Sequence, residues 1–215
     1  MHLEVLNRKQ KKIIPKLGFL KQYGFYLAGG TALALQIGHR TSQDLDFYTQ
    51  RHFRAKNLLK KIEKEIGIKP KEYSLAPDTI FIRILDVDMS FFYYEYPLIE
   101  PPIKMNSLSL ASKEDIAGMK ILSIIQRATK RDYIDIYFLL KEFSLESLLN
   151  FAKQKYPQLN LYMAIRALQY YKDINLEKER RRGRIYIFSG TTWPSIKRFL
   201  TKEVKKYQLD LIKPR

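Results

Sequence analysis

The chain has 215 residues and is 46% hydrophobic, which suits one large domain or two small ones with a buried core. It has no cysteine, which excludes disulfides and thiolate metal sites, and its three histidines are too few to favour a zinc site. The net charge of +17 is uneven: residues 1–105 hold 17 basic and 11 acidic groups, and residues 106–215 hold 22 and 11. This excess of basic residues favours a polyanionic partner such as RNA. A lysine-rich surface in an organism with biased amino-acid composition would give the same excess.

No apolar run is long enough to span a membrane, and the N-terminus carries no signal-peptide pattern. We therefore expect a cytoplasmic protein without a membrane partner. Residues 3–22 form an apolar helical pattern with a lysine-rich opposite side, and Pro15 predicts a kink or a split within it.

A strand at residues 25–28 runs into Gly29 and Gly30, and a short helix at 31–38 follows. Glycines allow a tight bend and a close approach of backbone N–H groups to a phosphate at a helix N-terminus. Thr31 begins the predicted helix, where its hydroxyl either caps the helix or contacts a phosphate.

A second strand at residues 44–49 carries Asp44 and Asp46. Residues two apart on a strand point to one face, so these carboxylates converge. Paired carboxylates facing a phosphate-binding turn are what metal-assisted chemistry on a nucleoside triphosphate needs. Before this strand, Arg40 either approaches the triphosphate or pairs with an aspartate, and Ser42 caps or closes the turn.

Residues 54–66 read as a helix that ends at Gly67. An edge strand is predicted at residues 69–76, followed by a turn at 77–78. Two further strands, at 79–84 and 87–94, are joined by a hairpin turn at 85–86. Three prolines between residues 97 and 102 then mark a domain boundary. We expect an α/β domain at residues 1–104, with a small mixed sheet, and a helical domain at residues 105–215 packed against it.

Within the second domain, Leu108 to Leu110 suggests one more strand. Ser112 and Asp115 form a capping-box pattern before a helix at 113–128. This helix carries Lys120 and Arg127, which lie seven residues apart and nearly in line. A lysine in such an apolar stretch is costly to bury without an anionic partner.

A second helix is predicted at residues 132–143, beginning at Asp132. Further helices are expected at 145–155 and 160–173 and from Thr191 to Leu209. Between them, residues 177–184 include four arginines that either grip a phosphate backbone or form a solvated charge run.

The Gly-Gly turn followed by Asp-x-Asp resembles the nucleotidyltransferase superfamily, which has a polymerase-beta-like fold. The sequence GGTALAL followed by GHRTSQDLDFY is similar to that of the AbiEii/MenT-like toxins, the nucleotidyltransferase components of bacterial toxin–antitoxin pairs. The resemblance implies that Asp44 and Asp46 hold Mg²⁺ or Mn²⁺, and that Gly29, Gly30, Thr31 and Arg40 bind the NTP.

The stretch SKEDIAGMKILSIIQRATKRDYIDIYFLL resembles the second block of the same family. The resemblance implies that Lys120 and Arg127 bind nucleotide phosphate, that Asp135 is the catalytic acid or base, and that Asp132 supports it. The alternative assigns no chemistry to them: Asp132 is an N-cap, Asp135 suits the helix dipole, and Lys120 reaches water.

Many nucleotidyltransferases have a third carboxylate on a later strand. The resemblance implies Asp88 as this third metal ligand, with Asp86 as a rival in the predicted turn. The implied function is Mg-dependent transfer of a nucleotide to an RNA acceptor such as a tRNA 3′ end, by the toxin of an AbiE-like type IV system with a cognate antitoxin. The alternatives are transfer to a protein or a small molecule, and a non-catalytic nucleic-acid-binding protein that keeps the fold.

Overall fold

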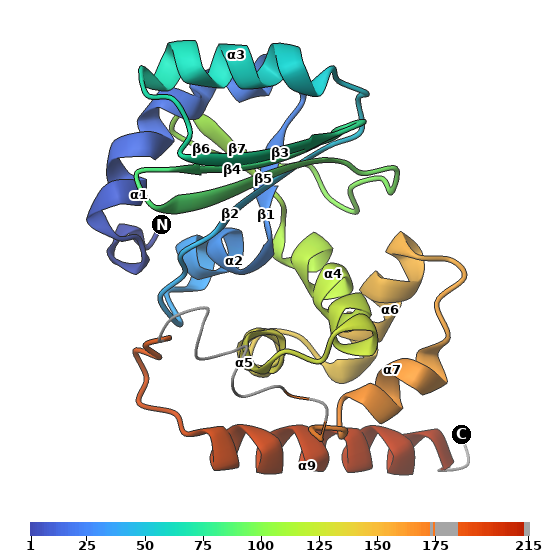
Figure 1. Cartoon of the computed structure of the whole chain (residues 1–215). Coiled ribbons are helices and arrows are strands. Elements are labelled where there is room, and N and C mark those ends of the chain that lie inside the picture. The colour runs from blue at the N-terminus through green and yellow to red at the C-terminus, as the bar shows by residue number, and fades with distance from the viewer. Residues whose placement is uncertain (173, 175–184, 213–215) are drawn as a thin grey trace. The chain divides into compact units, whose positions relative to one another are not determined.

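The computed structural model describes residues 1–172, 174 and 185–212 and divides into two compact units, Met1–Ser112 and Lys113–Arg215 (Figure 1). The first unit extends beyond the predicted boundary after residue 104. The reason is a short hairpin, β6 (Ile103–Met105) and β7 (Leu108–Leu110), which belongs to the sheet of the first unit. The strand at residues 108–110 was predicted, whereas its partner was not.

The first unit contains a seven-stranded mixed sheet, in the order β3-β4-β5-β2-β1-β7-β6. Its other strands are β1 (Tyr26–Ala28), β2 (Leu45–Thr49), β3 (Glu72–Ala76), β4 (Thr79–Ile84) and β5 (Val87–Tyr93). Strand β2 runs parallel to β5, β1 runs parallel to β7, and the other pairs are antiparallel. The α/β class, the edge position of β3 and the hairpin turn between β4 and β5 are as the sequence predicts.

The N-terminal helical pattern is split into three pieces: η1 (Leu3–Val5), α1 (Arg8–Ile13) and η2 (Ile14–Tyr23). Pro15 lies in the first turn of the 3-10 helix η2, where its missing N–H costs no helical hydrogen bond. The break predicted at this proline is therefore confirmed, with a change of helix type that the sequence pattern does not reveal.

Helices cover the sheet from opposite sides, with α3 (Ala55–Ile66) on one face and α2 (Gly29–Ile37) on the other (Figure 1). On the α3 side, Phe47 stacks on Phe91 with ring centroids 5.1 Å apart, and Phe25 packs on Phe91 and on Phe53. These rings, together with the buried apolar face of α3, form the core of the unit. The opposite face carries the alternate residues of the same strands.

The N-terminal segment fixes the loop between α2 and β2. The fully buried amide of Gln10 donates to the Gln43 carbonyl at 2.9 Å and accepts from the Asn7 backbone N–H, as part of a capping box. The backbone N–H of His2 donates to the carbonyl of Leu35 at 2.8 Å. These contacts hold both ends of the loop that leads to the carboxylate strand.

The second unit is helical. Its described helices are α4 (Lys113–Gln126), α5 (Lys130–Leu139), α6 (Leu145–Lys155), α7 (Leu161–Ala167) and α9 (Trp193–Ile212). The helix at 145–155 is confirmed, whereas the one predicted at 160–173 ends at Ala167. The arginine-rich segment at 177–184 lies outside the described residues.

Helices α4 and α6 approach closely at Gly118, where an added Cβ would lie 3.1 Å from the Phe151 carbonyl oxygen. Beside this contact, Lys155 Nζ donates to Asp115 Oδ1 at 2.7 Å, and both side chains have no solvent exposure. Asp115, predicted as part of a cap, thus joins two helices. No helix within the described ranges is both long and apolar enough to cross a membrane.

Candidate active site

Asp46 lies on the face of the sheet opposite to α3. Leu45 and Phe47 of β2 are buried toward the core, so Asp46, which alternates with them, points the other way. Strand β2 begins at Leu45 and not at residue 44 as predicted, so Asp44 directly precedes it. In the sheet register, Asp46 is the partner of Ala28 on β1 and of Ser90 on β5. We call this side the carboxylate face; the register places on it the side chains of Tyr26, Ala28, Asp46, Tyr48, Glu72, Ser74, Phe81, Arg83, Asp88, Ser90 and Phe92.

The glycine turn lies directly against Asp46. Gly29 has φ +67°, in the left-handed region that favours glycine, and it begins α2 straight after the extended residue Ala28. A Cβ on Gly29 would lie 3.2 Å from Asp46 Oδ2. The first backbone N–H groups of α2, which have no partner within the helix, therefore begin beside a carboxylate.

Thr31 has neither of its two predicted roles. It lies inside α2, which begins at Gly29 and not at Thr31, and it is 1% exposed. Its hydroxyl bonds to Ser42 Oγ at 2.7 Å and donates to the Asp44 carbonyl. This contact ties the helix after the glycine turn to the start of the carboxylate strand, and so fixes the turn against the aspartates.

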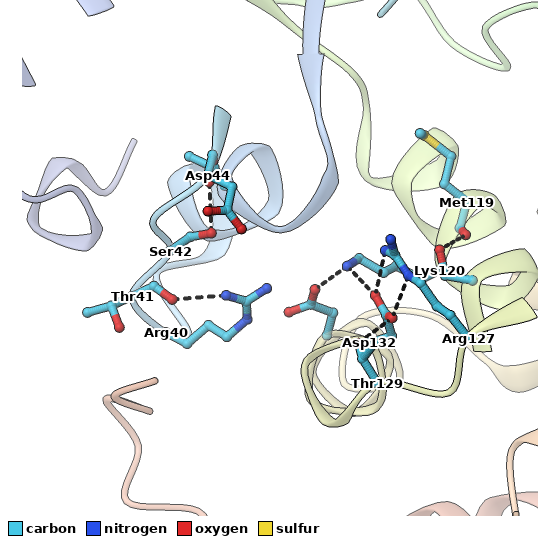
Figure 2. A network of polar contacts seen from close by, with 12 residues as sticks. Arg40, Thr41, Ser42, Asp44, Met119, Lys120, Arg127, Thr129 and Asp132 are labelled. Atoms are coloured by element: carbon cyan, nitrogen blue, oxygen red, sulfur yellow. Dashed lines mark hydrogen bonds and ion pairs between the residues drawn. The ribbon is translucent and has the colours of Figure 1, made fainter. Parts of the chain in front are cut away.

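Arg40 lies in the loop before β2 and is 2% exposed. Its Nη1 donates to the Thr41 carbonyl at 2.9 Å, so the guanidinium supports the loop from inside (Figure 2). This hydrogen bond satisfies one donor of the buried guanidinium. A role of Arg40 in binding the triphosphate stays a prediction.

Asp88 lies on the carboxylate face but is held by Arg83. The Arg83 Nε donates to Asp88 Oδ1 at 2.6 Å and Nη2 donates to Oδ2 at 3.0 Å. Ser90, rather than Asp88, lies beside Asp46 in the register. Among the described residues, no group of three His, Cys, Asp or Glu side chains could hold a metal. Asp88 as a third ligand therefore stays a prediction, and its ion pair argues against it.

Asp86, the rival third ligand, lies in the hairpin turn, where it has φ +58°. Its carboxylate pairs with Lys9 at 2.6 Å and with Lys71 at 3.2 Å. These partners lie on the exposed edge of the unit, which agrees with a turn residue without chemistry.

In the second unit, Lys120 connects the two aspartates of α5. Its Nζ lies 2.8 Å from Asp132 Oδ1 and 2.6 Å from Asp135 Oδ2 (Figure 2). Lys120 is 5% exposed, and the two carboxylates are almost fully buried. The anionic partner that the sequence requires for this lysine is therefore a pair of carboxylates.

Asp132 accepts hydrogen bonds from three residues of this cluster. It accepts from Lys120, from the Thr129 hydroxyl at 2.5 Å and from Arg127 Nε at 3.3 Å. Its interpretation as an N-cap is wrong, because Thr129 holds that position and Asp132 is the third residue of α5. Burial alone raises the pKa of Asp132, but the charges of Lys120 and Arg127 and the hydrogen bonds outweigh it and hold the pKa below its usual range.

The sequence analysis missed two residues of these clusters, Thr129 and Ser90. Thr129 precedes Asp132 by three residues, the spacing of a cap and its third helical residue, and this signal was available. Ser90 could be identified only from the register of β2 against β5, which joins segments more than 40 residues apart.

We predict that Asp132→Asn lowers the free energy of unfolding by about 2 kcal/mol at pH 7, because a buried cation loses a charged acceptor. A depressed pKa adds stability above the unfolded-state value, and this stability is lost as the pH falls through the folded-state value. The gap between wild type and variant should therefore begin to narrow below about pH 4 and close only below the folded-state pKa. Urea unfolding at pH 7 and at pH 3 measures it.

The matched control is Glu146→Gln, which alters an exposed carboxylate on α6 of the same unit. It should change the unfolding free energy by less than about 0.5 kcal/mol at either pH. Equal stability of Asp132→Asn and wild type at pH 7 would contradict the role of Asp132 as an ionised anchor.

Comparison with known proteins identifies the family of this chain. A family model described as Nucleotidyl transferase AbiEii toxin, Type IV TA system, matches residues 20–186. The uncharacterised protein aq_aa25 of Aquifex aeolicus (strain VF5) is 33% identical over 211 residues, which is 94% of this chain and 97% of that protein.

Two crystal structures of Helicobacter pylori proteins are similar at 18% identity. A proposed nucleotidyltransferase matches with TM-score 0.51 over 98% of this chain and 100% of that chain. JHP933 matches with TM-score 0.49 over 98% and 94%. The first likeness shows a shared fold, and the family match covers both sequence blocks. The chain therefore belongs to the AbiEii family of nucleotidyl transferase toxins of type IV toxin–antitoxin systems.

Proposed function

We propose that this protein transfers a nucleotide from an NTP to an RNA acceptor, such as a tRNA 3′ end, and acts as the toxin of an AbiE-like type IV pair. One observation carries the proposal: the glycine turn starts a helix beside Asp46 on β2, and Asp44 directly precedes this strand, with its carbonyl bonded to Thr31 of the same helix. A metal-binding pair of carboxylates and a phosphate-binding turn are thus adjacent within one unit.

The residues present fit a magnesium ion that is shared with the substrate. Mg²⁺ prefers oxygen ligands and is commonly bound by one or two carboxylates together with substrate phosphates and water. Asp44 and Asp46 offer such carboxylates, and the nucleotide would supply the remaining ligands. When bound, the ion neutralises charge on the phosphates and on the departing pyrophosphate.

The chain's own residues have distinct roles in this proposal. The N–H groups at Gly29 and Gly30 bind phosphate oxygens at the start of α2, and Arg40 supports the loop beside them. Lys120 and Arg127 offset phosphate charge. Lys120 is already bonded to Asp132 and Asp135, so it exchanges one of these partners when it meets a phosphate.

The acceptor hydroxyl oxygen forms a bond to the α-phosphorus of the NTP, and the bond from that phosphorus to the pyrophosphate oxygen breaks. Asp135 orients the hydroxyl and takes its proton, because a carboxylate whose Oδ2 is held 2.6 Å from Lys120 Nζ is fixed in position and accepts hydrogen bonds. Pyrophosphate leaves with the negative charge.

The RNA acceptor and the antitoxin are supported by the family and by charge. Members of this family are toxins of toxin–antitoxin systems, so we expect a cognate antitoxin protein as the partner. The net charge of +17 agrees with an RNA substrate.

The direct test incubates the purified chain with Mg²⁺, each α-labelled NTP, and RNA, protein or an aminoglycoside as acceptor. We expect label in RNA. Asp46→Asn should lower the rate by about 100-fold or more, the loss typical for removing one electrostatic group of a transition state. Asp86→Asn, which alters an exposed turn carboxylate, should retain the wild-type rate. Label in protein or drug alone would contradict the RNA acceptor, and no transfer of any NTP would contradict the enzyme.

A second prediction concerns the glycine turn. Gly29→Ala and Gly67→Ala both place a side chain at positive φ, +67° and +77°, so both should lose about 1–2 kcal/mol of stability. Only the Cβ on Gly29 meets the Asp46 carboxylate; nothing lies within 4 Å of the one on Gly67. We expect transfer activity to fall about 10- to 100-fold in Gly29→Ala and to persist in Gly67→Ala. Equal activity in both variants would contradict the turn's role.

A further inference from the structure

The carboxylate face carries a row of aromatic rings from four adjacent strands, Tyr26 of β1, Tyr48 of β2, Phe92 of β5 and Phe81 of β4. We call these four residues the aromatic row. Ring centroids are 6.2 Å apart between Tyr26 and Tyr48, 5.4 Å between Tyr48 and Phe92, and 5.4 Å between Phe92 and Phe81. The register of the strands fixes this arrangement, since Tyr26 pairs with Tyr48 and Tyr48 pairs with Phe92.

The row runs from the interior to the solvent. Tyr26 is 4% exposed, Tyr48 and Phe92 are half-buried, and Phe81 is 48% exposed. The Phe81 ring meets the Phe92 ring edge-on, with an interplanar angle of 76°, and its exposed part is apolar surface that hydration does not favour. The outer half of the row is therefore available to a planar partner.

The row leads directly to the metal-binding aspartates. Tyr48 follows Asp46 by two residues on the same face of β2. Ser90 pairs with Asp46 in the register and precedes Phe92 by two residues on β5. A chain that lies along the rings would thus have one end beside the carboxylates.

A pocket of about 290 Å³ adjoins the outer end of the row. Its lining includes positions of the carboxylate face on three strands: Glu72, Ser74, Phe81, Arg83, Asp88 and Ser90. Its size is at the lower end of small-ligand sites, and it combines a ring with hydroxyl groups. These features suit a nucleobase, which has both a π face and hydrogen-bonding edges.

The charges on this face select bases over phosphates. Arg83 is bonded twice to Asp88, and its Nη1 lies 3.6 Å from Glu72. One positive charge thus faces two carboxylates, so these three residues together carry a net charge of −1, which disfavours contact with phosphates. The overall charge of +17 attracts a polyanion to the protein, while this region contacts it through rings.

We propose that the aromatic row is the binding platform for a single-stranded segment of the RNA acceptor, whose bases stack on Tyr48, Phe92 and Phe81. The inference rests on the proposed function, because it takes RNA to be the acceptor. In known RNA-binding domains, bases of single-stranded RNA stack on aromatic side chains that project from the open face of a sheet. Several rings in line suit consecutive bases, whereas a free NTP has a single base.

The test measures binding without metal or NTP, so it does not depend on catalysis. A fluorescein-labelled single-stranded RNA of 12 nucleotides is titrated with wild type, Phe81→Ala, Phe81→Tyr and Tyr23→Ala, with fluorescence anisotropy as the readout. Tyr23 is the matched control, a 37% exposed ring at the end of η2, outside the aromatic row. Circular dichroism checks each fold, and Phe81→Leu replaces Phe81→Ala if the latter unfolds.

We expect Phe81→Ala to weaken binding about 5- to 10-fold, the effect of losing one base–aromatic stack, and Phe81→Tyr and Tyr23→Ala to bind like wild type. The slope of log affinity against log salt should not change, because no phosphate contact is lost.

Unchanged affinity in Phe81→Ala, an equal loss in Phe81→Tyr, or a changed salt slope would overturn the proposal. Failure of the wild-type protein to bind the RNA would overturn it too. So would a Phe81→Ala variant that keeps its RNA affinity and loses binding to a partner protein. Label transfer to RNA by Phe81→Ala at saturating RNA distinguishes a failed platform from a failed enzyme.

Discussion

The alternation of strand β2 is the constraint on which the first unit depends. Leu45 and Phe47 are buried in the core on the α3 side, and this burial fixes the face of every other residue of the strand. Asp46 and Tyr48 therefore share the carboxylate face, and a shift by one residue would turn both into the core. The Thr31 hydroxyl, bonded to Ser42 and to the Asp44 carbonyl, then holds the glycine turn against this strand.

The second unit buries charged side chains between its helices. Lys120 lies between Asp132 and Asp135, and Lys155 pairs with Asp115 between α4 and α6. Each of these two lysines has a carboxylate within 2.8 Å, which offsets much of the cost of removing both charges from water. The two clusters join different helices. Lys155 on α6 contacts Asp115 on α4, whereas Lys120 on α4 contacts Asp132 and Asp135 on α5. The charges of Lys120 and Arg127 contribute to holding the pKa of Asp132 below its usual range.

Local patterns in the sequence were enough to predict most of the elements. The bounds of β4 and the helix at 145–155 agree with the prediction because apolar periodicity and turn residues mark both ends of each segment. Contacts between distant segments could not be predicted in this way. The pairing of β2 with β5 put Ser90 beside Asp46, and an arginine on β4 engaged Asp88, the expected third ligand. Thr31 likewise looked like a helix start because its partners, Ser42 and Asp44, follow more than ten residues later.

The central claim is that Asp44 and Asp46 form one divalent-cation site that is completed by the nucleotide. Electron paramagnetic resonance of Mn²⁺, titrated into the chain with a non-hydrolysable NTP analogue, tests it most directly. The account predicts that wild type binds the ion far more tightly with the analogue than without it, and that Asp44→Asn/Asp46→Asn loses this binding while it stays folded. Undiminished Mn²⁺ binding by the folded double variant would contradict the account.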